Sequence, residues 1–487
     1  MSKGSKATDV KIGGLTADSR AVRDGDLFAA LPGVKLDGRR FIPDAIAKGA
    51  AAILAPTGTE MPDIVVGRAE AKQPFAFVTD DNPRRKLALM AARFYGEQPA
   101  SVVAVTGTNG KSSVVSFARQ IWTLMGIDGA SLGTLGLTAP SSKTAGSLTT
   151  PDPVALHRTL AELKQAGVDH VALEASSHGL AQYRLDGLEL TAAAFTNLTR
   201  DHLDYHGDED SYFAAKARLF SAILPKGGIA VLNADEPRFA ELRAICKNRG
   251  QRILAFGEKG GDIRLDILDV LPDGQRVSFA VAGEYAEVKL PLVGHFQAMN
   301  VACALGLVIA AGGAARAALA TLERLEGVDG RMQLAARHPA GAAVYVDYAH
   351  TPDALANVLG ALRPHTQGRL MVVFGCGGDR DPGKRPQMGR IAGELADIVI
   401  VTDDNPRSED AATIRRAVLA GVTDDKPLEI ADREEAIFAA VDMMSHGDVL
   451  VLAGKGHEQG QIVGATTIPF NDADEARKAV ARLGGRA

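Results

Sequence analysis

The chain has 487 residues, of which 46% are hydrophobic, and it carries a formal net charge of -5 at pH 7. That length predicts about three domains of roughly 150 residues each. The acidic balance and the lack of a long basic run exclude the electrostatic footprint of a nucleic-acid-binding protein. Three widely spaced cysteines without a C-x-x-C pair argue against a disulfide framework or a zinc ribbon, and they favour a reducing cytoplasm.

Residues 1–99 mix short strands with turns, and we expect them to form a small separate domain. A helix is predicted from Ile42 to Gly49. Turns around Ser19 and from Asp37 to Arg40 carry groups able to bind an anion, although solvated loops have the same composition. Further on, Asp81-Asn-Pro-Arg84 precedes a helical pattern, and we interpret Pro83 there as part of a turn and Asp81 as the helix cap.

The stretch Val103-Ala-Val-Thr-Gly-Thr-Asn-Gly-Lys-Ser-Ser113 has the composition of a phosphate-binding loop between a strand and a helix. Glycines at 107 and 110 let backbone N–H groups approach an anion, and the start of the helix adds its positive dipole end. Lys111 can reach phosphate oxygens and Ser112 can bind magnesium, so ATP or GTP is the expected ligand. Val105 stands where the common pattern has a glycine, which makes this a shorter variant that begins at Gly107.

Ionisable side chains follow two further strands of the same region. Glu174 ends one strand, and Asp201-His202 follows another. Because parallel strands end at one edge of their sheet, we expect these groups near the phosphate-binding loop, where they suit magnesium or manganese. Zinc is disfavoured because no helix carries the H-x-x-x-H or H-E-x-x-H spacing.

Apolar strands alternate with helices from residue 100 onward, which predicts parallel sheets covered by helices. The expected strands of a central domain at 100–329 and of a C-terminal domain at 330–487 are 102–105, 170–174, 192–196, 229–232, 343–346, 370–374, 398–401 and 449–452. The predicted fold class is α/β with three domains: an N-terminal domain, a central P-loop-type parallel-sheet ATPase domain and a C-terminal Rossmann-like domain. The uncharged stretch 296–315 contains Gln297 and Asn300, and we expect it to be a buried helix and not a membrane insertion.

Four motifs resemble those of the ATP-dependent Mur ligases, which add amino acids to the cytoplasmic peptidoglycan precursor. They are Gly107-Thr-Asn-Gly-Lys-Ser-Ser113, Glu174-Ala-Ser-Ser-His-Gly179, Asn197-Leu-Thr-Arg-Asp-His-Leu-Asp-Tyr-His-Gly207 and Asp347-Tyr-Ala-His-Thr-Pro-Asp353. The resemblance covers essentially the whole chain. It implies that ATP phosphorylates a substrate carboxylate and that an incoming amine then attacks the acyl phosphate.

The resemblance implies a catalytic group of Lys111, Glu174, His202 and Lys216. Ser112 and Glu174 would hold one Mg²⁺, and His202 would hold a second with Lys216 in its carbamylated form, N6-carboxylysine. By itself Lys216 has the pattern of a solvated helix face, and carbamylation needs a neutral amine, hence burial or a depressed pKa. The residues implied to bind ATP are Gly107, Thr108, Asn109, Gly110, Lys111, Ser112, Ser113, Asn300, Arg331 and Asp347.

The resemblance also implies two further substrates, UDP-N-acetylmuramoyl-L-alanyl-D-glutamate and meso-diaminopimelate. The implied contacts to the first are Ser19, Val34, Lys35, Leu36, Thr149, Thr150, Ser176, Gln182 and Arg184, with Leu148 in place of the usual Asn. Those to the second are Arg380, Asp404, Asn405, Pro406, Arg407, Gly454 and Glu458. Arg407 and Arg380 suit its carboxylates, and Glu458 suits an ammonium. Residues 81–84 have the same Asp-Asn-Pro-Arg sequence as residues 404–407, but they are assigned no site.

Alternatives remain open at this point. A sister ligase could add lysine, or it could add glutamate to a folate as folylpolyglutamate synthases do; Arg407 and the uridine contacts argue against both. A protein of another class, a nucleotide-driven switch, would hydrolyse ATP without forming a bond. We expect a cytoplasmic monomer.

Overall fold

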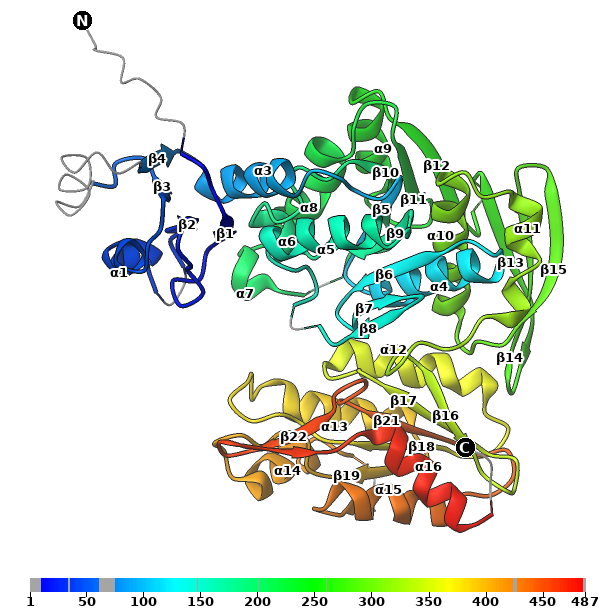
Figure 1. Ribbon diagram of the computed structural model, residues 1–487. Coiled ribbons are helices and arrows are strands. Elements are labelled where there is room, and N and C mark those ends of the chain that lie inside the picture. The colour runs from blue at the N-terminus through cyan, green and yellow to red at the C-terminus, as the bar shows by residue number, and fades with distance from the viewer. Residues whose placement is uncertain are drawn as a thin grey trace, which may run out of the picture. The chain divides into compact units, whose positions relative to one another are not determined.

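The computed structural model describes residues 10–33, 36–60, 75–146, 148–199, 201–259, 261–423 and 427–484. The chain divides into two compact units, one made of Met1–Lys111, Asp128–Ala230 and Pro237–Ile253, the other of Ser112–Ile127, Val231–Glu236 and Leu254–Ala487. Both are built from sheets and helices (Figure 1), so the predicted α/β fold class is confirmed. The boundaries placed at residues 99 and 329 stay a prediction.

The first sheet is parallel and is covered on both faces. Its strands follow in the order β1 (Gly14–Thr16), β2 (Asp26–Ala29), β3 (Ala52–Pro56) and β4 (Ala76–Asp80), with the 3-10 helix η1 (Gly38–Phe41) and the helices α1 (Ile42–Ala47) and α3 (Pro83–Tyr95). Phe28 packs with α1, whereas its neighbour Leu27 packs with α3, because successive side chains of a strand point to opposite faces. The Asn82 side chain caps α3 by accepting from the Arg85 N–H, so our assignment of the cap to Asp81 was wrong.

The first unit also holds the strands that lead into the motifs. They are β5 (Ser101–Thr106), β6 (Gly129–Gly133), β7 (Gly136–Ala139), β8 (Ser142–Thr144), β9 (His170–Glu174) and β10 (Leu190–Phe195). The helices between and after them are α5 (Pro153–Gln165), α6 (Ser177–Ala181), α7 (Leu203–His206), α8 (Glu209–Arg218) and α9 (Phe239–Asn248), with the π-helix η2 (Leu219–Ile223). The parallel register pairs Val105 with Glu174 and Thr106 with Phe195, which brings the ends of β9, β5 and β10 to one edge.

The chain crosses between the units in β11 (Ile229–Asn233) and β12 (Arg252–Gly257), and helix α4 (Lys111–Leu124) belongs to the second unit except for its first residue. The antiparallel strands β13 (Ile263–Leu271), β14 (Gly274–Val281) and β15 (Glu284–Leu290) precede α10 (His295–Ala310), α11 (Ala315–Leu319) and the 3-10 helix η3 (Leu322–Arg324). Most side chains of α10 are buried, as expected, but the helix ends at Ala310 and does not continue to residue 315. In the residues searched, those that the structure describes, no helix combines the length and apolarity needed to cross a membrane.

The last sheet has the order β16-β17-β21-β18-β19-β20. Its strands are β16 (Gln333–Arg337), β17 (Ala343–Asp347), β18 (Leu370–Phe374), β19 (Ile398–Val401), β20 (Leu428–Glu429) and β21 (Val449–Ala453). Its helices are α12 (Pro352–Leu362), η4 (Arg363–His365), α13 (Lys384–Leu395), α14 (Ala411–Leu419), α15 (Arg433–Asp442) and α16 (Asp472–Arg482), and β22 (Gly460–Val463) pairs with β23 (Thr466–Pro469) as a hairpin.

Alternation along these strands divides the apolar side chains between two cores. Val372 and Val451 pack with α12, α13 and α14, whereas Met371 and Leu450 pack with α15 and α16. A parallel sheet buried on both faces needs nearly continuous apolar strands, which is why the sequence located them so well. Phe374 pairs with both Val401 and Ala453, so the loops after β18, β19 and β21 start side by side.

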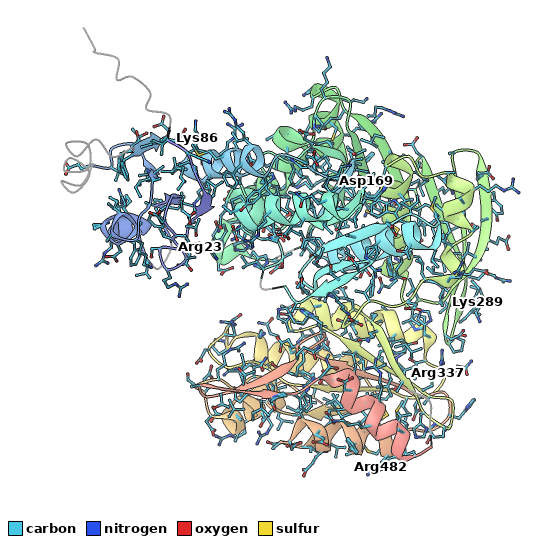
Figure 2. The ribbon with its side chains drawn as sticks, viewed as in Figure 1. Arg23, Lys86, Asp169, Lys289, Arg337 and Arg482 are labelled. Carbon is cyan, nitrogen blue, oxygen red and sulfur yellow. The ribbon has the colours of Figure 1, made fainter. Side chains whose placement is uncertain are left out.

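Charged side chains, Lys289 and Arg482 among them, lie on the outside of the molecule (Figure 2). Lys289 pairs with Asp273 at 3.2 Å, and Arg482 pairs with Asp442. All four side chains are about half exposed, and exposed pairs of this kind contribute only about 0–1 kcal/mol each. The fold therefore rests on the buried cores.

Candidate active site

The loop between β5 and α4 has the backbone of a tight phosphate-binding turn. Gly107 has φ 147° and Gly110 has φ 86°, and a Cβ atom at residue 107 would lie 1.9 Å from Oγ1 of Thr196. Only glycine fits at residue 107. Asn197 supports the loop, since its carbonyl oxygen accepts from the Thr108 N–H at 2.8 Å and its Oδ1 accepts from the Asn109 N–H at 2.9 Å. Helix α4 then begins at Lys111, as predicted.

Two lysines donate to the same carbonyl oxygen of this loop. Lys111 Nζ lies 2.9 Å from the Gly107 oxygen and 2.7 Å from that of Thr108, and Lys216 Nζ lies 2.7 Å from the Gly107 oxygen. Lys216 is 1% exposed and its Nζ stands 4.3 Å from the centre of the Tyr212 ring. Burial, and next the charge of Lys111, hold the pKa of Lys216 well below its usual value, while Asp201 opposes the shift. The buried position rules out the solvated helix face that its pattern would suggest by itself.

Glu174 is buried at the end of β9. Its Oε1 accepts from the Thr134 N–H at 2.8 Å and its Oε2 accepts from the Thr134 hydroxyl at 3.2 Å. A Cβ atom at residue 133 would lie 2.1 Å from Oε1, so the backbone of Gly133 lies close against the carboxylate. The pairing of Glu174 with Val105 places this carboxylate on the strand beside the one that leads into the phosphate-binding loop.

His202 lies in a group of aromatic side chains on α6, α7 and α8. It adopts a left-handed backbone with φ 51°, and its Nε2 lies 3.4 Å from the Asp201 carboxylate. The centre of its ring lies 4.9 Å from the centre of the His178 ring. The His178 ring centre lies in turn 4.1 Å from that of Tyr205 and 5.6 Å from that of His206. Burial is the main cause that lowers the pKa of His178 and of His206. Over the described ranges, no three His, Cys, Asp or Glu side chains are grouped so that they could hold a metal by themselves.

Most of the residues expected to contact the muramoyl peptide form one hydrogen-bonded network beside Glu174. The Thr149 and Thr134 hydroxyls lie 3.0 Å apart, and the Thr150 hydroxyl donates to the Glu174 carbonyl oxygen at 2.8 Å. The Ser176 hydroxyl is 3.0 Å from that of Thr150. This network therefore continues directly from the buried carboxylate.

Arg184 and Gln182 extend the same network. Arg184 donates to the Thr150 carbonyl oxygen and to Gln182 Oε1, each at 2.7 Å, and Gln182 Nε2 donates to the Tyr205 hydroxyl at 3.2 Å. Sequence reasoning missed Thr134 and Tyr205. Tyr205 lies inside a motif that we quoted, whereas no sequence signal marked Thr134.

The uridine contacts expected in the first domain are only partly described. Val34 and Lys35 lie outside the described residues. Leu36 is 61% exposed, and the Ser19 carbonyl oxygen accepts from Lys48 Nζ at 2.8 Å. Leu148 is also exposed. The expected contacts of Ser19 and Leu36 with uridine diphosphate therefore stay predictions.

The residues expected to bind the rest of the nucleotide are connected in the second unit. Asp347 ends β17, and its two carboxylate oxygens accept from the Met332 N–H at 2.7 Å and the Ala349 N–H at 2.8 Å. Burial raises its pKa, against the opposing charge of Arg331. The Arg331 guanidinium lies 4.6 Å from the centre of the Tyr348 ring. Asn300 is connected to Arg331 through Gln297. Asn300 donates to Gln297 at 3.0 Å, and Gln297 donates to the Arg331 carbonyl oxygen at 3.2 Å.

Three loops at the ends of β18, β19 and β21 carry the residues expected to bind diaminopimelate. Asn405 Nδ2 donates to Glu458 Oε2 at 2.9 Å, which joins the second loop to the third. Arg407, with φ 52°, donates to the Gly378 carbonyl oxygen at 2.8 Å, which joins the second loop to the first. The three loops thus form one connected group.

The same loops approach one another closely at their glycines. A Cβ atom at Gly377 would lie 2.7 Å from Arg407 Nη1 and 3.9 Å from Cγ of Arg380, so both arginines flank this residue. A Cβ atom at Gly454, where φ is 110°, would lie 2.8 Å from the Asp404 carboxylate, and one at Gly378 would lie 1.9 Å from the Pro406 carbonyl oxygen. Larger residues would push the loops apart.

A buried ion pair lies behind these loops. Arg433 and Asp472 are both 0% exposed in their side chains and share two hydrogen bonds of 2.7 Å. Arg433 also donates to the carbonyl oxygens of Ala453, at 3.0 Å, and Asp403, at 3.5 Å. Since Asp404 and Gly454 come next in sequence, the pair fixes the starting points of two loops. Sequence reasoning missed it, because nothing in the sequence says that these two charges are buried together.

Comparison with known proteins decides the family. Family models match at residues 11–95 (Mur ligase family, catalytic domain), 105–308 (Mur ligase middle domain) and 330–456 (Mur ligase, glutamate ligase domain). A Rhizobium meliloti (strain 1021) protein named UDP-N-acetylmuramoyl-L-alanyl-D-glutamate--2,6-diaminopimelate ligase is 53% identical over 481 residues, which cover 99% of this chain and 96% of that protein. The chain belongs to the Mur ligase family. Members of this family are ATP-dependent ligases, so the predicted family and enzyme class are confirmed.

Solved structures agree with this assignment. A structure of a UDP-N-acetylmuramoyl-L-alanyl-D-glutamate--2,6-diaminopimelate ligase is 34% identical to this Mur ligase, with a TM-score of 0.71, and the match covers 97% of this chain and 95% of that one. A folylpolyglutamate synthase of Mycobacterium tuberculosis complexed with ADP matches with a TM-score of 0.61 over 76% of this chain and 91% of its own. At 18% identity the second likeness shows a shared fold alone.

Proposed function

We propose that this Mur ligase joins meso-diaminopimelate to the D-glutamate carboxylate of UDP-N-acetylmuramoyl-L-alanyl-D-glutamate at the expense of ATP, acting as a monomer in the cytoplasm. The relatives named for this reaction are about half identical to the chain over nearly its full length. The observation that carries the choice of amino acid is the group of loops in which Asn405 ties Glu458 to the Arg407 loop. Diaminopimelate has a distal ammonium and a distal carboxylate, and lysine has no distal carboxylate.

The first step activates a carboxylate, which is a poor electrophile. The carboxylate oxygen attacks the γ-phosphorus of ATP, the bond to the β-phosphate oxygen breaks, and ADP leaves with the electron pair. The N–H groups of Thr108 and Asn109 already donate to Asn197 and are therefore occupied. The phosphates would instead contact the first turn of α4, which carries Lys111, Ser112 and Ser113. Lys111 would then supply positive charge where negative charge develops. Asn300, Arg331 and Asp347 would hold the adenine, phosphates and ribose.

The residues present fit magnesium. Glu174 offers a buried carboxylate and Ser112 a hydroxyl, and these hard oxygen donors are those that Mg²⁺ prefers. For the second ion, His202 offers an imidazole, and the burial of Lys216, which lowers its pKa, favours the neutral amine that addition of CO₂ needs. Bound magnesium would neutralise charge that builds up on the phosphoryl oxygens.

The second step forms the amide. The neutral α-amine of diaminopimelate attacks the acyl carbon, phosphate leaves with the electron pair, and the nitrogen loses its extra proton. Arg407 can grip the distal carboxylate with two parallel hydrogen bonds, Arg380 can hold the other carboxylate, and Glu458 can accept from the distal ammonium. These contacts would orient the attacking amine without taking part in the bond change.

The UDP substrate would lie along the network beside Glu174. Hydroxyls of Thr149, Thr150 and Ser176 and the amide of Gln182 suit a neutral sugar and peptide, and Arg184 suits a carboxylate or the pyrophosphate. Because Thr150 is bonded to the Glu174 backbone, this binding surface and the expected metal site are built on the same strand end. Because both are built on one strand end, the acceptor carboxylate would be held close to the γ-phosphate.

The test is phosphate release from ATP and Mg²⁺ with the UDP-muramoyl dipeptide, comparing meso-diaminopimelate with lysine. We expect turnover with diaminopimelate only, and a loss of about 10- to 100-fold in kcat/KM for diaminopimelate in Arg407→Ala, the range of one charged hydrogen-bonded contact. Arg390→Ala is the matched control, because Arg390 is an exposed arginine of α13 that pairs with Glu394 at 2.8 Å. Equal turnover with lysine would overturn the choice of amino acid, and phosphate release without any amino acid would overturn the ligase reaction.

A further inference from the structure

Lys455 is a completely buried lysine in the loop after β21. Its side chain is 0% exposed, and its Nζ donates to three oxygens: that of Gly460 at 2.7 Å, Glu458 Oε2 at 3.1 Å and Asn405 Oδ1 at 3.2 Å. A buried ammonium group is strongly unfavourable unless it is paired and hydrogen-bonded. The geometry meets both conditions, with one carboxylate and two neutral oxygens around the nitrogen.

These contacts tie together three segments of the proposed diaminopimelate site. Asn405 belongs to the loop after β19, Glu458 to the loop after β21, and Gly460 is the first residue of β22. Asn405 Oδ1 also accepts from the Ile462 N–H at 2.9 Å. Since two donors converge on Oδ1, the other end of the Asn405 amide, its NH₂ group, is directed to Glu458.

The carboxylate of Glu458 is held from one side. Both of its hydrogen bonds within the described chain, from Lys455 and from Asn405, end on Oε2. The side chain is 32% exposed, so a ligand can reach it. This arrangement presents Oε1 as the oxygen that meets an ammonium group.

We propose that Lys455 is a positioning residue for the distal ammonium of diaminopimelate, which it serves by fixing the orientation of the Glu458 carboxylate together with Asn405. The proposal rests on the proposed function, because it needs diaminopimelate as the substrate. Because its side chain is 0% exposed, Lys455 would not touch the substrate itself. It acts through Glu458, and it also fastens the β22 end to the pocket through the Gly460 carbonyl oxygen.

The experiment measures steady-state KM and kcat for each of the three substrates in Lys455→Met. We expect the KM for meso-diaminopimelate to rise about 10-fold or more, the change that losing one hydrogen bond to a charged group corresponds to, with the KM values for ATP and the UDP substrate within about twofold. Lys478→Met is the matched control. Lys478 also pairs with a glutamate three positions away, Glu475, at 2.8 Å, but it is 63% exposed and lies on α16.

A double-mutant cycle separates positioning from general support of the fold. Glu458→Gln should raise the KM for diaminopimelate by itself, and adding Lys455→Met to it should raise the KM by less than twofold more, because the carboxylate that Lys455 orients is already gone. Independent, multiplying effects would show that Lys455 does not act through Glu458 and would overturn the proposal. If Lys455→Met lowers the unfolding temperature so far that it cannot be assayed, Lys455→Gln, which keeps a donor without the charge, enters the same cycle.

The outcomes also distinguish the two levels of inference. A wild-type enzyme that shows no diaminopimelate-dependent phosphate release refutes the proposed function before any variant is compared. A wild-type enzyme that turns over with diaminopimelate, together with a Lys455→Met variant whose KM for it is unchanged, leaves the proposed function in place and overturns the role of Lys455.

Discussion

Two buried lysines, one in each unit, occupy opposite kinds of environment. Lys216 donates to a neutral carbonyl oxygen, lies over the Tyr212 ring and has the charge of Lys111 beside it. Lys455 is equally inaccessible, but a carboxylate and two further oxygens surround it. Burial disfavours a charge in both places, and among the described residues only Lys455 has a counter-charge within hydrogen-bond distance. We therefore expect Lys216 to serve the reaction at the phosphate-binding loop and Lys455 to support the structure of the proposed diaminopimelate site.

The largest expected effect is on the reaction itself. Lys216→Met should reduce kcat by about 10³-fold, because a preorganised electrostatic group is typically worth 10² to 10³ in rate. Wild-type enzyme under ¹³CO₂ should show a carbamate resonance that the variant lacks. Lys164→Met is the control, since Lys164 is a partly exposed lysine, with 34% of its side chain accessible, that pairs with Asp169 at 2.6 Å. A wild-type enzyme that is fully active without the resonance would show that the reaction does not need the proposed carbamylation of Lys216.

The next effect concerns stability around the amino-acid pocket. Arg433→Met should lower the free energy of unfolding by about 3–5 kcal/mol, because it leaves the buried Asp472 carboxylate without its partner. Urea denaturation measures the change. The double variant Arg433→Met/Asp472→Leu, which removes both charges, should recover most of the loss, and a double variant as unstable as the single one would contradict this explanation.

Removing Lys216 should affect stability differently from removing Arg433, because Lys216 donates to a neutral carbonyl oxygen and not to a carboxylate. In CO₂-free buffer the folded state favours the neutral amine, whereas the unfolded chain keeps the ordinary pKa of 10.5. Between the lowered pKa and 10.5 the unfolded chain binds more protons, so stability rises with pH in that window and is lowest below it. The difference in unfolding free energy between wild type and Lys216→Met should rise by up to about 1.4 kcal/mol per pH unit there. A difference that does not change with pH would mean that burial does not disfavour the charge.

The smallest effect is expected at the surface. Arg482→Ala breaks an ion pair with Asp442 whose side chains are about half exposed, and it should change the free energy of unfolding by less than about 1 kcal/mol. The same urea denaturation measures it. A loss comparable to that of Arg433→Met would show that burial is not what separates the two ion pairs.

Much of the fold could be predicted because its signals are local. Continuous apolar runs located β9, β18 and β19 to the residue, since buried parallel strands must be apolar on both faces. The phosphate-binding loop was found because a positive φ and a close approach to Thr196 demand glycine at residue 107. Such constraints act on single residues and are visible in the sequence.

Other features needed the packed chain. Asn82 and not Asp81 caps α3, a choice between neighbours that depends on backbone angles. Lys455 lies between Gly454 and Glu458, which were expected to bind diaminopimelate, yet sequence reasoning assigned it no role. Thr134 had no signal either, because a hydrogen-bond partner that is distant in sequence leaves no local pattern. The sequence by itself determined eight apolar strands from residue 100 onward, the loops at their ends and the family, but not the remaining strands, such as the antiparallel β13, β14 and β15. Only the tertiary structure decided which lysines are buried, and with what beside them, because burial and charge pairing are properties of groups that folding brings together.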